Sequence, residues 1–234
     1  MFYLDPLYLV FALPALLLAF WAQMRVRSAY NKYLRVPNAR GVTGLEAAQV
    51  LLQSQGLGDI QIEGIPGELS DNYDPRNKTL HLSQRVANGR SVASLGIVAH
   101  EVGHAVQDQT GYGPMRLRAG IVPMVQVGAW LGPIIFFVGL VLFNSPDLAA
   151  VGLILFSLSA VFALITLPVE LNASHRALQM LTANGLVIDA QEAAGARQVL
   201  NAAAWTYVAA LVQILSTLLY YVSILGGFGG RRRR

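Results

Sequence analysis

Four long apolar runs constrain the fold of this chain more than any other feature. They cover residues 7–22, 121–143, 148–169 and 202–225, and few polar side chains interrupt them. At about 1.5 Å of rise per residue, runs of this length can cross a bilayer as helices. The chain is 54% hydrophobic and only 13% charged, whereas about a quarter of the residues of soluble domains are charged. We therefore expect a mainly helical integral membrane protein with about four transmembrane helices.

Basic residues predict the orientation of these spans. Arginine and lysine are frequent in residues 23–120, occur again in residues 170–201, and are absent from the turn at 144–147. Because basic loops stay in the cytoplasm, the first two segments are predicted to be cytoplasmic and the turn to be outside. The first run lacks a signal-peptide cleavage site and is predicted to be a retained anchor. The arginines at 231–234 fit this topology only as a tolerated exception, as non-native sequence, or if the last helix does not cross.

The segment between the first two runs contains the pattern His-Glu-x-x-His, at His100, Glu101 and His104. Because a helix turns once every 3.6 residues, both imidazoles project from one side and can bind the same tetrahedral Zn²⁺ ion. Glu101 lies beside that side, where a carboxylate can accept a proton from a zinc-bound water, as in metallopeptidases. The alternative is a core helix whose histidines are satisfied by hydrogen bonds.

Local signals predict the elements around this pattern. Ser91 is a suitable N-cap for the histidine helix, and Gly111 is a suitable end for it. Thr43 and Glu46 form a capping box that opens an earlier helix. Between residues 59 and 82, alternating apolar residues and turn signals predict a small sheet. This sheet either offers a free edge to an extended substrate or only covers the histidine helix.

A catalytic zinc site needs a third protein ligand, and the chain has no cysteine to supply a thiolate. Glu170 is the strongest candidate, because a carboxylate where a membrane helix meets the cytoplasm is costly unless it is paired or metal-bound. Two predicted crossings separate it from His104, so both residues reach the same membrane face. Ala173, Ser174 and Ala177 share the helix face of Glu170, and their small size would allow the histidine helix to approach closely.

Other polar residues have competing interpretations. His175 either donates to a developing oxyanion or lies among lipid headgroups. Arg176 either stabilises the oxyanion or extends to the membrane interface. His81 is expected to be solvated on an edge strand, and Asp189 and Glu192 are expected to open the last helix as a capping box.

Several stretches together resemble a known family. They are Asp74-Pro75-Arg76, Leu82-Ser83, residues 88–96 leading into 99–105, Pro168-Val169-Glu170 with Ala173-Ser174, and residues 202–204 with 206–210. In order and spacing they resemble the membrane-bound neutral zinc metallopeptidases of the YugP type. The resemblance implies an integral membrane zinc protease, mostly bacterial.

The chain is also similar to the gluzincin membrane proteases of the CAAX-processing and stress-protease type, in which the histidine motif is followed by E-x-x-A-D. Here the corresponding stretch is Glu170-Leu171-Asn172-Ala173-Ser174. The similarity implies a ligand role for Glu170. Ser174 stands where those families have an aspartate, and a serine orients a ligating histidine more weakly than a carboxylate does.

The expected function is peptide-bond hydrolysis with one Zn²⁺ ion per chain. His100, His104 and Glu170 are the predicted ligands, Glu101 is the general base, and His175 or Arg176 assists the oxyanion. The expected location is a bacterial plasma (inner) membrane, with the catalytic site facing the cytoplasm and acting on membrane-proximal or misfolded proteins. The alternative is a catalytically silent, zinc-stabilised membrane scaffold, against which the intact Glu101 argues.

Expected partners are protein or peptide substrates, membrane lipids, and either a second copy of the chain or another membrane protein. Nucleic acid is not expected, because the basic residues flank membrane spans. The predicted segments are an N-terminal anchor (1–24), a cytoplasmic zincin-like catalytic region (25–120), a transmembrane hairpin (121–169), cytoplasmic helices with the third ligand (170–201), and a C-terminal transmembrane helix with a basic tail (202–234).

Overall fold

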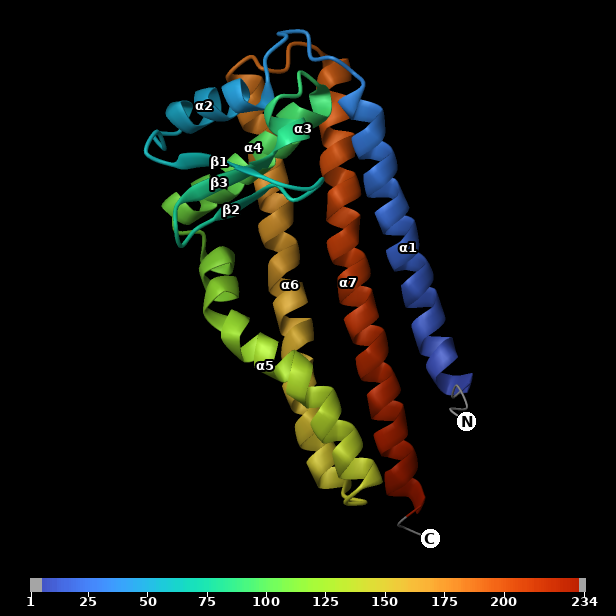
Figure 1. Cartoon of the computed structure of the whole chain (residues 1–234). Helices are drawn as coiled ribbons and strands as arrows, with labels where there is room; N and C mark the ends of the chain where they lie inside the picture. Colours follow the sequence, from blue (N-terminus) through green and yellow to red (C-terminus); the bar gives the residue numbers. More distant parts are fainter. Residues whose placement is uncertain (1–5, 232–234) are drawn as a thin grey trace. The chain divides into compact units, whose positions relative to one another are not determined.

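A computed structural model describes residues 6–231 and shows a mainly helical chain with one small sheet (Figure 1). The elements in order are α1 (Pro6–Leu34), α2 (Gly44–Ser54), β1 (Gln61–Ile65), β2 (Asn72–Asp74), β3 (Thr79–Ser83), α3 (Gln84–Ala87), α4 (Val92–Gln109), α5 (Gly113–Val141), α6 (Pro146–Ala183) and α7 (Ala190–Arg231). This confirms the predicted class of a mainly helical chain with a small sheet. The arginines at 232–234, whose topology was left open, lie outside the described residues.

The chain divides into two compact units, which are described separately. The apolar unit consists of Met1–Ala22, Leu117–Leu167 and Thr206–Arg234. The polar unit consists of Gln23–Arg116 and Pro168–Trp205. The four long helices α1, α5, α6 and α7 each contribute residues to both units.

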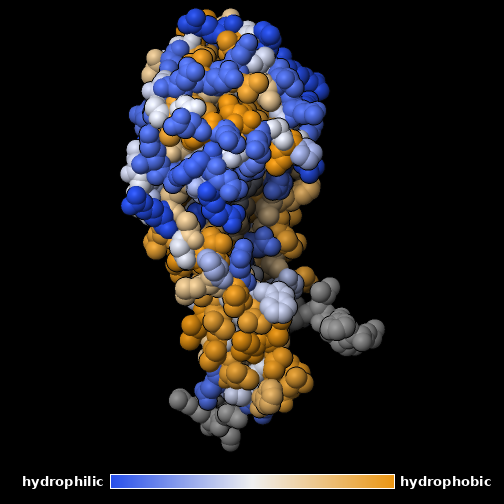
Figure 2. Space-filling view, turned by 60° about the vertical axis from the view of Figure 1, so that its left-hand side comes forward, coloured by the Kyte–Doolittle hydropathy of each residue, from blue (hydrophilic) through white to orange (hydrophobic). Residues whose placement is uncertain are grey.

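The same four helices are long and apolar enough to cross a membrane. In their most apolar windows, between 11% and 28% of the residues are buried inside the protein itself. Most of these side chains therefore need a cover that the chain does not provide, and Figure 2 shows a continuous hydrophobic surface over the apolar unit. Lipid would provide that cover, so the helices are consistent with a membrane protein.

Glycines allow α5 and α6 to pack closely within the apolar unit. A Cβ atom added to Gly132 would lie 2.7 Å from the backbone nitrogen of Phe156, which is too close for any side chain. Small residues at such positions let helix backbones approach each other in a membrane. Beside this contact, the ring of Phe136 stacks on Tyr221 of α7 with centroids 4.4 Å apart.

The polar unit contains the sheet, whose strand order is β1-β3-β2. β1 pairs with β3 in parallel, and β2 pairs with β3 antiparallel. The prediction that His81 lies on an edge strand was therefore wrong, because β3 is the central strand. His81 is opposite Glu63 of β1, with 3.8 Å between Nδ1 and Oε2. Alternation along β3 predicted a strand correctly, but it carries no information about which segments pair with each side.

Most of the predicted local signals are confirmed. The Thr43 and Glu46 capping box is complete, and the Ser91 side chain accepts a hydrogen bond from the Ser94 backbone N–H at 3.1 Å. Gly111, just beyond the end of α4, has φ = +64°, a conformation that glycine adopts without strain.

The second predicted capping box is only half formed. The Glu192 backbone N–H donates to Asp189 Oδ1 at 2.7 Å, as predicted. The Glu192 carboxylate does not return to Asp189. It accepts instead from the backbone N–H groups of Ile188 at 3.0 Å and Ala39 at 2.6 Å. Glu192 therefore ties the start of α7 to the loop after α1, a long-range contact that a local pattern does not encode.

Candidate metal centre

The fold of α4 places the two histidines at a surface that the rest of the polar unit partly covers. Five apolar side chains of this helix are almost completely buried in the core: Leu95, Val98, Ala99, Val102 and Ala105. His100 and His104 lie between these positions along the helix and are partly exposed. The apolar residues therefore fix the rotation of α4, and that rotation leaves both imidazoles on one accessible side.

A close contact between α4 and α6 brings the third residue to the histidines. A Cβ atom at Gly103 would lie 2.7 Å from the carbonyl oxygen of Ala173, so only glycine fits there. Ala173 and Ala177 are completely buried on the α6 side. α6 continues past the apolar run to Ala183, so Glu170 lies inside a helix, one turn before this contact.

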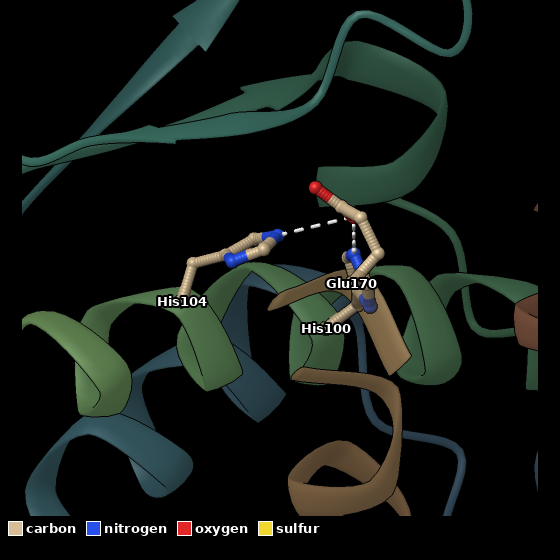
Figure 3. A group of neighbouring side chains, drawn as sticks. All are labelled: His100, His104 and Glu170. Carbon is tan, nitrogen blue, oxygen red and sulfur yellow. Dashed lines mark hydrogen bonds and ion pairs between the residues drawn. The ribbon is translucent and has the colours of Figure 1, made fainter. Parts of the chain in front are cut away.

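The side chains of His100, His104 and Glu170 point toward one another (Figure 3). Glu170 Oε2 lies 3.2 Å from His100 Nε2 and 3.5 Å from His104 Nε2. Single ligand atoms from the three residues all lie within 4.8 Å of one another. A tetrahedral zinc with bonds of about 2.0–2.2 Å places neighbouring ligand atoms about 3.3–3.6 Å apart. The donor set therefore fits Zn²⁺, and the two distances from Glu170 to the histidines are close to this spacing.

The other ring nitrogen of each histidine is held by a polar side chain. His100 Nδ1 lies 3.2 Å from the hydroxyl of Ser174. His104 Nδ1 lies 3.0 Å from Oε1 of Gln107. With both Nδ1 atoms engaged in this way, both Nε2 atoms face the Glu170 carboxylate, as metal-ligating histidines require.

Glu101 lies beside this group as a second buried carboxylate, with 9% of its surface exposed. Among the described residues no group donates a hydrogen bond to it. Burial raises the pKa of the Glu101 carboxyl, while the charges of His100 and His104 oppose the rise. The carboxylate is therefore placed close to the candidate ligands without being tied to any of them.

The charges within the group also act on His104. Burial by itself would lower the pKa of this imidazole, but its contact with Glu170 and the negative charges of Glu101 and Glu170 outweigh burial and raise it. In the metal-free protein the group therefore favours a proton on His104, and a metal ion would compete with that proton.

Comparison with known proteins identifies the family. The family described as "Putative neutral zinc metallopeptidase" matches residues 8–226. The chain belongs to this family. The "Putative membrane protease YugP" of Bacillus subtilis (strain 168) is 43% identical over 218 residues, which cover 93% of this chain and 96% of that protein. No solved structure gives a significant match.

The predicted resemblance to YugP-type zinc metallopeptidases is thus confirmed. Membership of a zinc metallopeptidase family implies zinc as the metal and supports a protease function in general. The relative's name, together with the four apolar helices, supports a membrane protein. The roles of individual residues rest on the geometry described above.

In this member of the family the two candidate oxyanion donors lie in different surroundings. His175 is exposed on α6. Arg176 is partly buried, and its Nε donates to Oδ1 of Asn172 at 2.8 Å. The structure therefore brings together the three predicted ligands and the nearby Glu101, and it places Arg176 in a hydrogen-bonded contact on α6.

The sequence interpretation missed Gln107 and Asn172. Gln107 is completely buried, and its Nε2 donates to the Val169 carbonyl at 2.8 Å and to Asn172 Oδ1 at 3.0 Å. A weak signal was present, because Gln107 is three residues after His104 and so shares its helix face. Asn172 lies four residues before Arg176 on α6, which is a similar local signal, but its contact with Gln107 joins two helices and has no such signal.

Proposed function

We propose that the chain is a membrane-bound zinc metalloendopeptidase that hydrolyses peptide bonds in membrane-proximal or misfolded proteins. The observation that carries this proposal is the setting of Glu101, a buried carboxylate to which no group of residues 6–231 donates a hydrogen bond, beside two histidines and a second carboxylate. A structural zinc site gains nothing from such a group, whereas hydrolysis requires a base at this place. The family and the relative's name support the same reaction class.

The proposed roles follow from the position of each side chain. His100, His104 and Glu170 would hold one zinc ion, which supplies Lewis-acid catalysis by activating water and polarising the scissile carbonyl. Glu101 accepts the proton of the attacking water and passes it to the leaving amine. We retain His175 and Arg176 as candidate donors to the oxyanion.

The proposed location of the site is the cytoplasmic face of the membrane. It is supported by the basic residues of the polar unit and by their absence from the turn between α5 and α6. This location supports the proposed substrate class, since a site on the cytoplasmic side of the membrane would meet segments that leave the bilayer.

The decisive experiment compares the purified protein with its Glu101→Gln variant. Both should bind about one zinc per chain, because Glu101 is not a proposed ligand. Cleavage of casein or of an unfolded membrane protein should fall by at least about 100-fold, as expected for removal of a general base. Glu63→Gln, the same change at a mainly exposed site of the polar unit, is the matched control. Equal cleavage by the Glu101→Gln variant and the wild type would overturn the mechanism.

The ligand assignment has a separate test. The Glu170→Gln variant should lose most of its bound zinc, because a neutral amide is a much poorer zinc ligand than a carboxylate. Bound zinc is measured after gel filtration in detergent, with Glu63→Gln again as the control. Full zinc occupancy in the Glu170→Gln variant would show that another residue is the third ligand.

A further inference from the structure

We propose that Gln107 is a positioning residue that fixes the orientation of the His104 ring and couples it to α6, with Asn172 and Arg176 holding Gln107 in place. This inference rests on the proposed function only in taking His104 as a zinc ligand. It assigns a function to a hydrogen-bonded chain that runs from Arg176 through Asn172 and Gln107 to His104, joining two helices.

The Gln107 carboxamide is completely buried and fully hydrogen-bonded. Its oxygen faces His104 Nδ1 at 3.0 Å, and its nitrogen reaches the Val169 carbonyl at 2.8 Å and Asn172 Oδ1 at 3.0 Å. A buried amide that lost these partners would be destabilising. The carboxamide is therefore held at both ends, with its oxygen facing a residue of α4 and its nitrogen bonded to residues of α6.

Only one orientation of the Gln107 amide is compatible with its surroundings. The Val169 carbonyl can only accept a hydrogen bond, so it requires the Gln107 nitrogen. The contact between Gln107 and Asn172 is fixed by Arg176. The Arg176 guanidinium can only donate, so the side-chain oxygen of Asn172 must face it. That oxygen then also faces Gln107. If the Gln107 amide were reversed, its oxygen would lie against two other oxygen atoms.

The orientation of the Gln107 amide also determines the tautomer of His104. Since Gln107 presents an oxygen, His104 Nδ1 must carry the hydrogen and donate it. The lone pair of the neutral ring is then on Nε2, which is the atom that faces Glu170 at 3.5 Å. Arg176 thus acts through two amides to present the ligating atom of His104 toward the other ligands.

The two histidines differ in this respect. His100 Nδ1 meets the Ser174 hydroxyl at 3.2 Å, and a hydroxyl can donate as well as accept. Ser174 therefore does not dictate the His100 tautomer, whereas Gln107 dictates that of His104. We expect the loss of Gln107 to weaken zinc binding more than the loss of the Ser174 hydroxyl.

The test measures zinc affinity by chelator competition in the purified full-length protein, without a substrate. The Gln107→Met variant keeps the side-chain length but loses every hydrogen bond, and its zinc dissociation constant should rise about 10–100-fold. The Ser174→Ala variant should show a smaller rise. The Asn172→Asp variant keeps oxygen acceptors for Gln107 and Arg176 and should stay close to the wild type, while Asn172→Leu should resemble Gln107→Met.

A second measurement reports on the ring itself. The chain has four histidines, so ¹⁵N-histidine NMR of the zinc-loaded protein can resolve each one. The Nδ1–H of His104 should exchange slowly with water in the wild type and fast in the Gln107→Met variant. A variant that only loosened the fold would accelerate exchange at other sites too.

Wild-type zinc affinity together with an unchanged His104 signal in Gln107→Met would overturn the proposal. If that variant does not fold, the Asn172→Asp and Asn172→Leu pair decides, and equal affinities in this pair would overturn it. The proposed function is tested separately. If the wild type cleaves no peptide bonds but its zinc affinity depends on Gln107, the peptidase assignment is refuted and the positioning role of Gln107 stands.

Discussion

Glu101 and Glu170 are both buried near the two histidines, and their contacts separate the chemistry that each can perform. Glu170 is 3% exposed, and one of its oxygens faces both histidine Nε2 atoms. Its lone pairs therefore point to the position that a metal would occupy. Glu101 has no hydrogen-bond donor among the described residues, so its lone pairs are available to a water molecule. The difference supports a ligand role for Glu170 and a proton-transfer role for Glu101.

Asp71 provides a pH-dependent prediction at the residue scale. Burial raises the pKa of its carboxyl, against the hydrogen bonds it accepts from the backbone N–H and the hydroxyl of Ser83. A carboxyl whose pKa is higher in the folded state than in the unfolded state stabilises the fold when it is protonated. This stabilisation is complete below about pH 3.9, the pKa of Asp in the unfolded chain, and it is lost as the pH rises through the pKa of the folded state. The Asp71→Asn variant should therefore be more thermally stable than the wild type at pH 7, and its advantage should shrink toward pH 4.

Asp74 is the control for this prediction, because its shift has the opposite sign. The backbone N–H of Arg76 donates to the Asp74 carboxylate and lowers its pKa. The ionised Asp74 carboxylate therefore stabilises the fold above the pKa that Asp has in the unfolded chain, and this stabilisation is lost as the pH falls through the pKa of the folded state. The Asp74→Asn variant should be slightly less stable than the wild type at pH 7. Melting temperatures in detergent between pH 4 and 8 test both variants. A pH-independent difference for Asp71→Asn would contradict the prediction.

The sequence predicts residues of the site when their pattern lies within one element, and it does not when the pattern joins two elements. The four-residue spacing of His100 and His104 is a property of one helix, so it could be interpreted without the fold. Glu170 was found because a carboxylate at the end of an apolar run is costly. Gln107 was missed because a buried amide cannot be told from an exposed one until the partner helix is known.

At the scale of elements, the contact between α4 and α6 sets the distance between the histidines and Glu170. Gly103 faces Ala173 with no room for a Cβ atom, whereas a Cβ atom at Gly96 of the same helix would meet Ala196 at an ordinary 3.6 Å. The Gly103→Ala variant should therefore separate the two helices. We expect it to lose about 1–3 kcal/mol of stability, as in other overpacked contacts, and to bind zinc more weakly.

Gly96→Ala is the matched control for this prediction. Alanine favours a helix by about 1 kcal/mol over glycine, and both substitutions add this amount to the stability of α4. Gly96→Ala should therefore be as stable as the wild type or more stable, with unchanged zinc affinity. Thermal unfolding and zinc titration of the two variants provide the measurement. A Gly103→Ala variant that is as stable and binds zinc as tightly as Gly96→Ala would refute the close-contact argument.

The sheet shows where prediction of elements from the sequence ends. A small sheet was expected between residues 59 and 82, and its strands lie there or extend one residue beyond, although β2 (Asn72–Asp74) was not predicted as a strand. Their order was not predictable, because the parallel pairing of β1 with β3 joins segments 18 residues apart, such as Gln61 and Thr79. Burial on both faces of β3 is what a central strand requires, and burial depends on the whole fold.

At the scale of the whole molecule, the chain combines an apolar unit that its own residues leave largely uncovered with a polar unit that has a closed core. The exposed apolar surface of the first is consistent with a bilayer, but it does not show on which side of a membrane the polar residues lie. Only the distribution of basic residues addresses that question. The absence of basic residues from the turn between α5 and α6 is the strongest evidence, because that turn is short and the rule applies best to short loops.

The topology can be measured directly, because the chain contains no cysteine and single cysteines can be introduced without background. Ser54→Cys places a thiol on an exposed position of α2, and Asp147→Cys places one in the exposed turn at the start of α6. In intact spheroplasts a membrane-impermeant maleimide should label only the Asp147→Cys variant, and both should react after permeabilisation. Labelling of Ser54→Cys before permeabilisation would show that the polar unit, with the candidate metal centre, lies outside the cytoplasm. The expected substrates would then be extracytoplasmic segments.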